Sequence, residues 1–379
     1  MTDWHRLHTS LDCALAGRDL QVRDAAFLLD QTDPLAREQV RLAADHLRAD
    51  LVGDQVTYVI NRNINFSNIC VQHCSFCAFR RDSNQEGAYW LDFTPILAKT
   101  AEAVAGGASE ICMQGGLNPA VRPGNGRVLD YYLRLAGEIK TRFPALHLHA
   151  FSPQESFFIA REDNLPIETV LAELGAGGVD SMPGTAAEVL YEPIRRRLCP
   201  EKLSTYDWVT TVRAAHRAGL PMTSTLLSGH IETALHRAIH LGVLRSIQQQ
   251  TGGFTEFVLL PYVGAAAPRA LRRQVGHDQP VLDDALLTQA VARLFLGRWI
   301  VNHQPSWVKL GLDGAAEALR WGCNDIGGTL MEEHITTMAG AQGGTCQSPE
   351  DLERAIRLTG RTPVQRDTLY RPVAVVATS

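Results

Sequence analysis

The stretch VTYVINRNINFSNICVQHCSFCAF, residues 56–79, joins an expected β-strand to a loop that carries three cysteines. Its first residues are rich in β-branched and aromatic side chains, which favour a strand. Cys70, Cys74 and Cys77 follow directly. If this strand is the first of a parallel α/β barrel, the cysteines lie in the first loop at the C-terminal ends of the strands, where barrel active sites are built.

The rest of the chain repeats the alternation of strand and helix. The expected strands are 56–60, 109–114, 146–151, 178–182, 221–227, 254–260, 306–312 and 324–328. Helical patterns lie between them, among others from about 94, from 204 to 219 and from 281 to 301. Eight strands alternating with helices imply parallel pairing and right-handed crossovers. The sequence therefore predicts an α/β fold, a closed (β/α)8 barrel of the TIM type.

Helical segments flank the expected barrel on both sides. We expect an N-terminal helical extension over 1–55, the barrel over 56–347, and a C-terminal helix and tail over 348–379. Thr32-Asp33-Pro34 has the composition of a helix start, and so has Ser348-Pro349. The tail from about 361 is expected to be irregular.

Composition excludes several classes of protein. The net charge of −5 argues against a nucleic-acid binder that depends on phosphate contacts. No apolar run approaches the roughly 20 residues of a membrane span, and the N-terminus lacks the pattern of a signal peptide. The expected location is the cytoplasm, where thiols stay reduced, so clustered cysteines bind metal or do chemistry rather than form disulfides. The other five cysteines are scattered and are interpreted as small buried apolar residues.

The cysteine spacing C-x3-C-x2-C gives three soft ligands, which suit zinc, copper(I) or an iron–sulfur cluster. A structural zinc site needs a fourth ligand, and His73, inside the first gap, would have to point back at the same ion. A four-iron cluster on three cysteines instead leaves one iron open for a substrate or cofactor. The cluster is favoured, with zinc and unligated thiols as the alternatives.

This motif, in the first loop of a barrel and with Phe76 before the third cysteine, resembles the radical S-adenosylmethionine (SAM) superfamily. The resemblance implies a [4Fe-4S] cluster on Cys70, Cys74 and Cys77, with SAM bound through its methionine part at the open iron. An electron from the cluster would then cleave the sulfonium and give a 5′-deoxyadenosyl radical.

Further segments narrow the resemblance. They are QGGLNP (114–119), HLHAFSPQE (147–155), SMPGTAAEVL (181–190), PEKLSTYDW (200–208) and GGTLMEEHITTMAGA (327–341). Together they resemble the group that contains the futalosine-pathway enzymes of menaquinone synthesis and the two activities of deazaflavin (FO) synthase. Within that group, HLHAFSP, SMPGTAAEVL and the run from CAFRRD (77–82) to GAYWLD (87–92) are most similar to the tyrosine-using FO synthase component. This implies a transferase that joins the 4-hydroxybenzyl group of L-tyrosine to 5-amino-6-(D-ribitylamino)uracil on the way to coenzyme F420. It would release 2-iminoacetate, methionine and 5′-deoxyadenosine.

The same resemblance implies an electron donor and a ring-closing radical SAM subunit of FO synthase as functional partners. Two other functions stay open at this point. One is a futalosine-pathway enzyme of menaquinone synthesis, such as the cyclase that acts on dehypoxanthine futalosine. The other, from a different class, is a non-catalytic zinc-binding protein.

Candidate cofactor contacts follow several of the expected strands. They are Gln114, Gly115, Gly116, Ser152, Glu155, Asp180 and Arg197. The glycine pair resembles the superfamily's pair, whose backbone approaches the methionine amino group. A turn that needs glycine flexibility is the alternative. For Ser152 the alternative is a helix N-cap, and for Glu155 it is an acid exposed to solvent.

Candidate substrate contacts are His149, Ser181, Lys202 and His230. Candidate catalytic residues are Glu332, Glu333 and His334, because a base could keep the amine of tyrosine neutral. For these three, an acid-rich helix start stabilised by the helix dipole is the alternative.

Overall fold

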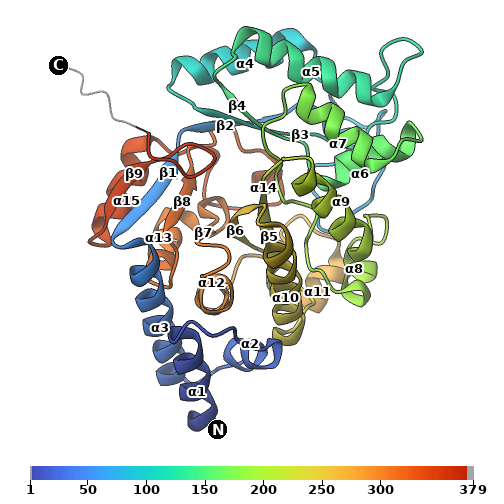
Figure 1. Cartoon of the computed structure of the whole chain (residues 1–379). Helices are drawn as coiled ribbons and strands as arrows, with labels where there is room; N and C mark the ends of the chain where they lie inside the picture. The colour runs from blue at the N-terminus through green and yellow to red at the C-terminus, as the bar shows by residue number, and fades with distance from the viewer. Residues whose placement is uncertain (1, 374–379) are drawn as a thin grey trace, which may run out of the picture.

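The computed structural model describes residues 2–373 and places the parallel strands inside, with helices outside them (Figure 1). The last residues of the expected tail, 374–379, lie outside the described residues. The strands are β1 Gln55–Val59, β2 Asn61–Asn65, β3 Glu110–Gln114, β4 His147–Ala150, β5 Met222–Ser228, β6 Phe254–Pro261, β7 Asn302–Pro305, β8 Asp325–Gly328 and β9 Thr362–Gln365.

Helices connect most successive strands. In chain order they are α1 Trp4–Leu15, α2 Val22–Leu29, α3 Pro34–Val52, α4 Phe93–Ala105, α5 Val128–Arg142, α6 Pro153–Glu162, α7 Ile167–Ala176, α8 Glu192–Leu198, α9 Thr205–Arg217, α10 Ala234–Thr251, α11 Arg269–Val275, α12 Leu282–Leu296, α13 Trp307–Leu319, α14 Ile335–Met338 and α15 Pro349–Leu358. Among residues 2–373, no helix combines the length and the apolar content that crossing a membrane requires.

All the paired strands are parallel, in the three sheets β8-β1-β9, β2-β3-β4 and β5-β6-β7. Short links join the sheets into a ring. Ser181 bridges to β4, and Met182 bridges to β5. The amide of Asn324 donates to the carbonyl of His303 at 3.1 Å, which links the segments of β7 and β8. The predicted barrel of parallel strands is therefore confirmed.

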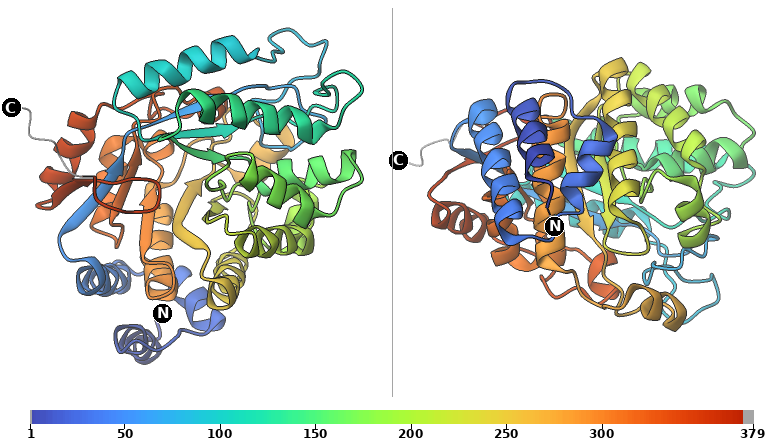
Figure 2. Two further views of the ribbon diagram at one scale, coloured as in Figure 1. Left: turned by 45° about the horizontal axis from the view of Figure 1, so that its top comes forward. Right: turned by 90° about the horizontal axis from the view of Figure 1, so that it is seen from below.

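The predicted helix starts at both ends of the chain are confirmed. Asp33 caps α3 by accepting from the amides of Leu35 and Ala36, and Pro34 occupies the first turn. Ser348 caps α15 in the same way, accepting from the amide of Asp351. The N-terminal helices α1–α3 pack on α10 and α12, on the outside of the strands (Figure 2).

Two expected strands and the expected irregular tail differ from the structure. The run 306–312 is not a strand, because Pro305 ends β7 and α13 begins at Trp307. This helix is broken at Gly311, whose φ of 72° suits glycine. In 178–182 only Ser181 and Met182 form bridges. The tail after 361 is not irregular, because β9 pairs with β1.

Candidate functional site

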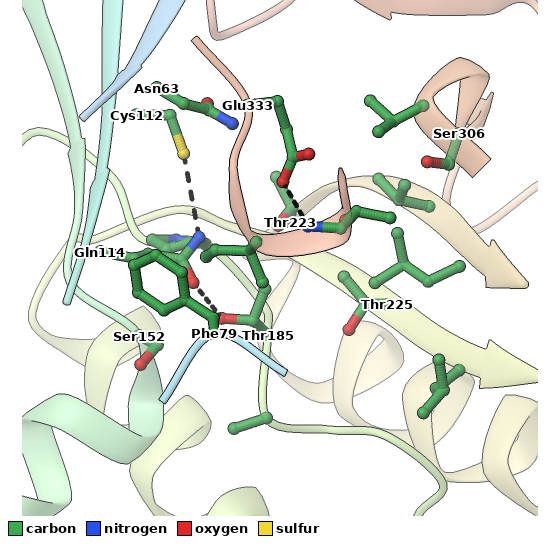
Figure 3. Close-up of a pocket in the computed structure, with 18 of the residues that line it drawn as sticks. Asn63, Phe79, Cys112, Gln114, Ser152, Thr185, Thr223, Thr225, Ser306 and Glu333 are labelled. Atoms are coloured by element: carbon green, nitrogen blue, oxygen red, sulfur yellow. Dashed lines mark hydrogen bonds between the residues drawn. The ribbon is translucent and has the colours of Figure 1, made fainter. Parts of the chain in front are cut away.

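A cavity of about 430 Å³ opens inside the barrel and runs between the two ends of the strands. We call its two ends the mouth and the floor. The mouth is formed by the cysteine loop and by residues at the C-terminal ends of the strands. The floor is formed by residues at the N-terminal ends of the strands and by the segment after β9. Figure 3 shows part of the wall, with Cys112 and Gln114 on one side and Ser306 on the other.

Cys70, Cys74 and Cys77 all line the mouth, in the loop that follows β2. The loop is tied to its neighbours by hydrogen bonds to backbone carbonyls. The amide of Val71 donates to the carbonyl of Leu117 at 3.0 Å, and the hydroxyl of Ser75 donates to the carbonyl of Leu198 at 2.6 Å. The loop therefore has a fixed place against β3 and α8.

The three thiols are mostly buried and do not close around a single ion. Burial raises the pKa of Cys74 to about 12 and raises the pKa of Cys70, so these thiols are protonated unless a metal binds them. Within residues 2–373, no group of three His, Cys, Asp or Glu side chains surrounds a possible single-ion position. His73 is more than half exposed, and its Nδ1 contacts Glu201 at 3.1 Å. A closed zinc site therefore has no ligand set in the described part of the chain.

Gly115 and Gly116 follow β3 in the chain and pack against the segment that leads into the cysteine loop. A Cβ on Gly116 would lie 2.2 Å from the carbonyl oxygen of Ile69, and one on Gly115 would lie 2.4 Å from the ring of Phe66. The amide of Gly116 donates to the carbonyl of Ser67 at 2.7 Å. Packing against these neighbours therefore requires glycine at both positions. This requirement is separate from the close approach of the methionine amino group that the resemblance implies.

Ser152 and Glu155 form the capping box of α6, and both line the cavity. Glu155 is only 2% exposed and accepts from the amide of Gly115 at 2.9 Å as well as from Ser152. Burial outweighs these bonds and raises the pKa of Glu155 to about 7. Glu155 is therefore not a solvated acid. It ties α6 to the glycine pair. Beside it, the amide oxygen of Gln114 accepts from the hydroxyl of Thr185 at 3.0 Å (Figure 3).

The candidate His149 lines the cavity. The candidates Asp180 and Ser181 do not. Asp180 lies one residue before Ser181 and Met182, which form the β-bridges, so it does not end a strand. Its carboxylate pairs with Lys140 at 2.8 Å and accepts from the amide of Leu148. Ser181 contacts Nδ1 of His149 at 2.6 Å. Burial lowers the pKa of His149 to about 4, so its imidazole is neutral near pH 7.

Lys202 lines the mouth, whereas Arg197 is exposed on α8 and lies outside the cavity. The ammonium of Lys202 pairs with Glu188 and lies 5.4 Å from the centroid of the Phe76 ring. Burial opposes the charge, but the neighbouring carboxylate holds the pKa of Lys202 above its usual range. A permanent cation thus lies beside the cysteine loop.

Among Glu332, Glu333 and His334, only Glu333 lines the cavity. Its carboxylate accepts from the amide of Thr336 at 2.9 Å (Figure 3). Glu332 pairs with Lys99 and Arg62, which lower its pKa to about 2 against the effect of partial burial. His334 is half-exposed and contacts Glu332 at 3.0 Å.

The candidate His230 is buried but does not line the cavity, because its ring is held between Glu232 at 2.8 Å and the carbonyl of Leu227. These contacts hold the ring away from the cavity.

Sequence reasoning missed the floor. Glu110, Glu256 and Arg366 line the cavity there, and Arg366 pairs with Asp325 at 2.5 Å. The hydroxyl of Tyr370 donates to Glu256. These residues are far apart in the chain, so no local motif marks them. Cys112 and Lys309 also line the cavity and were not predicted as site residues.

Comparison with protein families gives two adjoining matches. Residues 64–241 match the radical SAM superfamily, and residues 251–378 match the CofH/MqnC C-terminal region. The first match spans the cysteine loop and the second spans the floor segment.

Close relatives cover almost the whole chain. A protein of Gloeobacter violaceus named 5-amino-6-(D-ribitylamino)uracil–L-tyrosine 4-hydroxyphenyl transferase is 78% identical over 99% of this chain and 96% of its own length. Proteins of the same name from a Cyanothece species and from Synechococcus elongatus are 61% and 59% identical, over 96% and 100% of this chain and 97% and 99% of their own lengths.

Solved structures share the fold at low identity. Methylornithine synthase superposes with a TM-score of 0.72 at 17% identity, over 93% of this chain and 97% of its own. The hydrogenase maturase HydG superposes with a TM-score of 0.71 at 14% identity, over 95% of this chain and 75% of its own.

Proposed function

This chain belongs to the family of radical SAM 5-amino-6-(D-ribitylamino)uracil–L-tyrosine 4-hydroxyphenyl transferases, and we propose that it catalyses the reaction that names the family. It joins the 4-hydroxybenzyl group of L-tyrosine to 5-amino-6-(D-ribitylamino)uracil, a step in FO synthesis. The observation that carries the proposal is the trio of thiols at the mouth of the cavity, in a chain 78% identical to such a transferase.

The residues at the mouth suit an iron–sulfur cluster. Cys70, Cys74 and Cys77 supply three soft ligands on one wall of the cavity. Three cysteine ligands leave one iron of a four-iron cluster open for SAM. We infer that these three cysteines hold a [4Fe-4S] cluster. Cluster and SAM together supply a 5′-deoxyadenosyl radical after one-electron reduction.

The glycine pair and α6 keep the cysteine loop in place. Gly116 holds Ser67 through its amide, and Glu155 accepts from the amide of Gly115. We therefore assign Glu155 and Ser152 to positioning the wall on which SAM binds. Gln114 and Thr185 are the polar groups of that wall that we assign to direct contact with SAM.

Two other residues of the cavity are assigned to the polar substrates. Glu333 is the member of the acidic run that lines the cavity, so we assign it to the ammonium group of tyrosine, where it accepts a hydrogen bond or a proton. His149 is neutral and its ring is fixed by Ser181, so it can exchange one hydrogen bond with the aminouracil.

The test is an assay of the reconstituted protein. The chain is purified without oxygen, loaded with iron and sulfide, and incubated with SAM and dithionite, with each substrate alone and with both. The proposal expects about four irons per chain and a coupled product only when both substrates are present. Formation of 5′-deoxyadenosine with a futalosine substrate and not with tyrosine would overturn it.

The reaction also needs partners. An electron donor must reduce the cluster before SAM can be cleaved. We propose that the product passes to the ring-closing radical SAM subunit of FO synthase. Added together, the two proteins should convert tyrosine and the aminouracil to FO, which is detected by its fluorescence.

A further inference from the structure

The chain has only four lysines, and three of them pair with carboxylates. Lys99 pairs with Glu332 at 2.6 Å, Lys140 pairs with Asp180 at 2.8 Å, and Lys202 pairs with Glu188. Lys309 is the exception. Its ammonium makes no salt bridge and no hydrogen bond to any residue of the described part of the chain, and yet it lines the central cavity.

The fold places Lys309 on the catalytic side of the barrel. It lies in the first turn of α13, directly after β7, and its amide donates to the carbonyl of Ser306. Ser306 lies across the cavity from Cys112 and Gln114 (Figure 3). α13 begins directly after Ser306 and carries Lys309 in its first turn, so we place Lys309 on the wall of Ser306, opposite the end of β3.

Two carboxylates act on Lys309 through space, and neither forms a salt bridge with it within residues 2–373. They are Glu333, which accepts from the amides of Thr336 and Thr337, and Glu188, which pairs with Lys202. Burial lowers the pKa of Lys309 to about 8, so at pH 7 most of the lysine is still charged. Lys309 is partly buried, and a cation withdrawn from water without a paired anion is unfavourable, so a ligand that brings a carboxylate reduces that penalty.

The cavity holds further polar atoms without partners. The hydroxyl of Tyr262, a residue only 1% exposed, and the amide oxygen of Asn63 are buried and make no hydrogen bond within residues 2–373. Both residues line the cavity. A polar ligand is therefore expected in this space, independently of Lys309.

We propose that Lys309 binds the carboxylate of the tyrosine substrate. This inference rests on the proposed function, because that function supplies an amino acid as the ligand. SAM carries the only other carboxylate of the reaction. The opposite wall favours tyrosine, since SAM binds beside the cysteines.

The first experiment measures equilibrium binding to the reconstituted holoenzyme. Lys309→Met keeps the length of the side chain and removes the charge, and Lys309→Arg restores a cation. We expect Lys309→Met to weaken tyrosine binding about 10- to 100-fold, the range for a hydrogen bond to a charged group, and Lys309→Arg to recover part of it. Lys140→Met, which removes a lysine outside the cavity, should leave the affinity unchanged.

Two ligands identify the group that Lys309 binds. Tyramine keeps the phenol and the amine of tyrosine but lacks the carboxylate, so Lys309→Met should bind tyramine as well as the wild type does. The Kd for SAM should also be unchanged. Equal losses for tyrosine and tyramine would overturn the proposal, and so would a loss confined to SAM.

A second measurement uses the wild-type holoenzyme and does not depend on the stability of a variant. Protein grown with isotope-labelled lysine gives four side-chain signals, and Lys309→Arg identifies the signal of Lys309 by its loss. Tyrosine should shift that signal and raise its pKa, whereas tyramine should not. An unchanged signal in a wild-type protein that still makes coupled product from tyrosine would refute the role of Lys309 and leave the proposed function standing. Failure of the wild type to use tyrosine would instead refute the function.

Discussion

The mouth and the floor of the cavity are built in opposite ways. The mouth takes its thiols from Cys70–Cys77, eight residues of one loop, and the groups that hold this loop are mostly backbone amides and carbonyls. The floor takes Glu110, Glu256, Asp325 and Arg366 from separate segments, and Arg366 forms ion pairs with Glu256 and Asp325. The mouth is therefore a local motif placed by packing, whereas the floor exists only in the folded chain. Changes at the mouth should cost chemistry, and changes at the floor should cost stability.

The largest expected effect is at the mouth. Cys70→Ala, Cys74→Ala or Cys77→Ala should each abolish cluster binding and SAM cleavage, because three ligands hold the cluster with none to spare. The thermal unfolding of the metal-free protein should change little. Iron analysis and 5′-deoxyadenosine formation check this, with the exposed Cys346→Ser as the control. SAM cleavage by any of the three alanine variants would contradict the ligand assignment.

The next effect is at the floor. Arg366→Met leaves Asp325 and Glu256 buried without their cation, and breaking a buried pair in this way costs about 3–5 kcal/mol. Urea unfolding should show this loss. Arg354→Met, which breaks an exposed pair on α15, should cost about 0–1 kcal/mol. Equal losses for the two variants would remove the distinction between the floor and an ordinary surface pair.

Gly116→Ala tests whether packing holds the mouth in place. The added methyl group would meet the backbone of Ile69, which cannot rotate away, so we expect a cost of about 1–3 kcal/mol and a displaced cysteine loop. The readout is a lower iron content per folded chain. Gly137→Ala, in α5 with nothing within 4 Å, is the matched control and should keep its iron. Full iron content in Gly116→Ala would mean that the loop tolerates the shift.

The effect that is smallest near pH 7 is a pH dependence from His149, which develops only as the pH falls. Its pKa is about 4 in the folded chain and about 6.5 when unfolded, so the unfolded chain binds the proton more tightly between these values. The stability that His149 contributes is therefore present above pH 6.5 and is lost as the pH falls toward 4, by up to about 1.4 kcal/mol per pH unit. His149→Gln should flatten that slope in urea unfolding, and the exposed His46→Gln should not. Parallel slopes for wild type and His149→Gln would contradict the lowered pKa.

The contrast also explains what the sequence could predict. The cysteine triad and the caps at Asp33 and Ser348 are local patterns whose physics lies within a few residues, and these predictions of structure hold. The alternation of strands and helices predicted the barrel for the same reason. Asp180 was expected at a strand end, but the bridging segment begins one residue later and its carboxylate turns to Lys140.

The floor could not be predicted in this way. Glu256 and Arg366 are 110 positions apart, and only the pairing of β9 with β1 brings the second into the barrel. Lys309 was not predicted as a site residue because residues 306–312 were expected to form a strand. In the structure Lys309 lies in the first turn of α13 and lines the cavity. Which residues of the acidic run 332–334 face the cavity likewise depends on a turn that the sequence does not specify.

The most direct measurement of the central claim follows the tyrosine ring. Reconstituted protein is given SAM, dithionite, the aminouracil and tyrosine labelled with carbon-13 in its ring, and the products are analysed by mass spectrometry. The account predicts a product that contains the aminouracil together with all the labelled ring carbons, and unlabelled 5′-deoxyadenosine formed with it. Labelled tyrosine recovered intact while 5′-deoxyadenosine accumulates would contradict it.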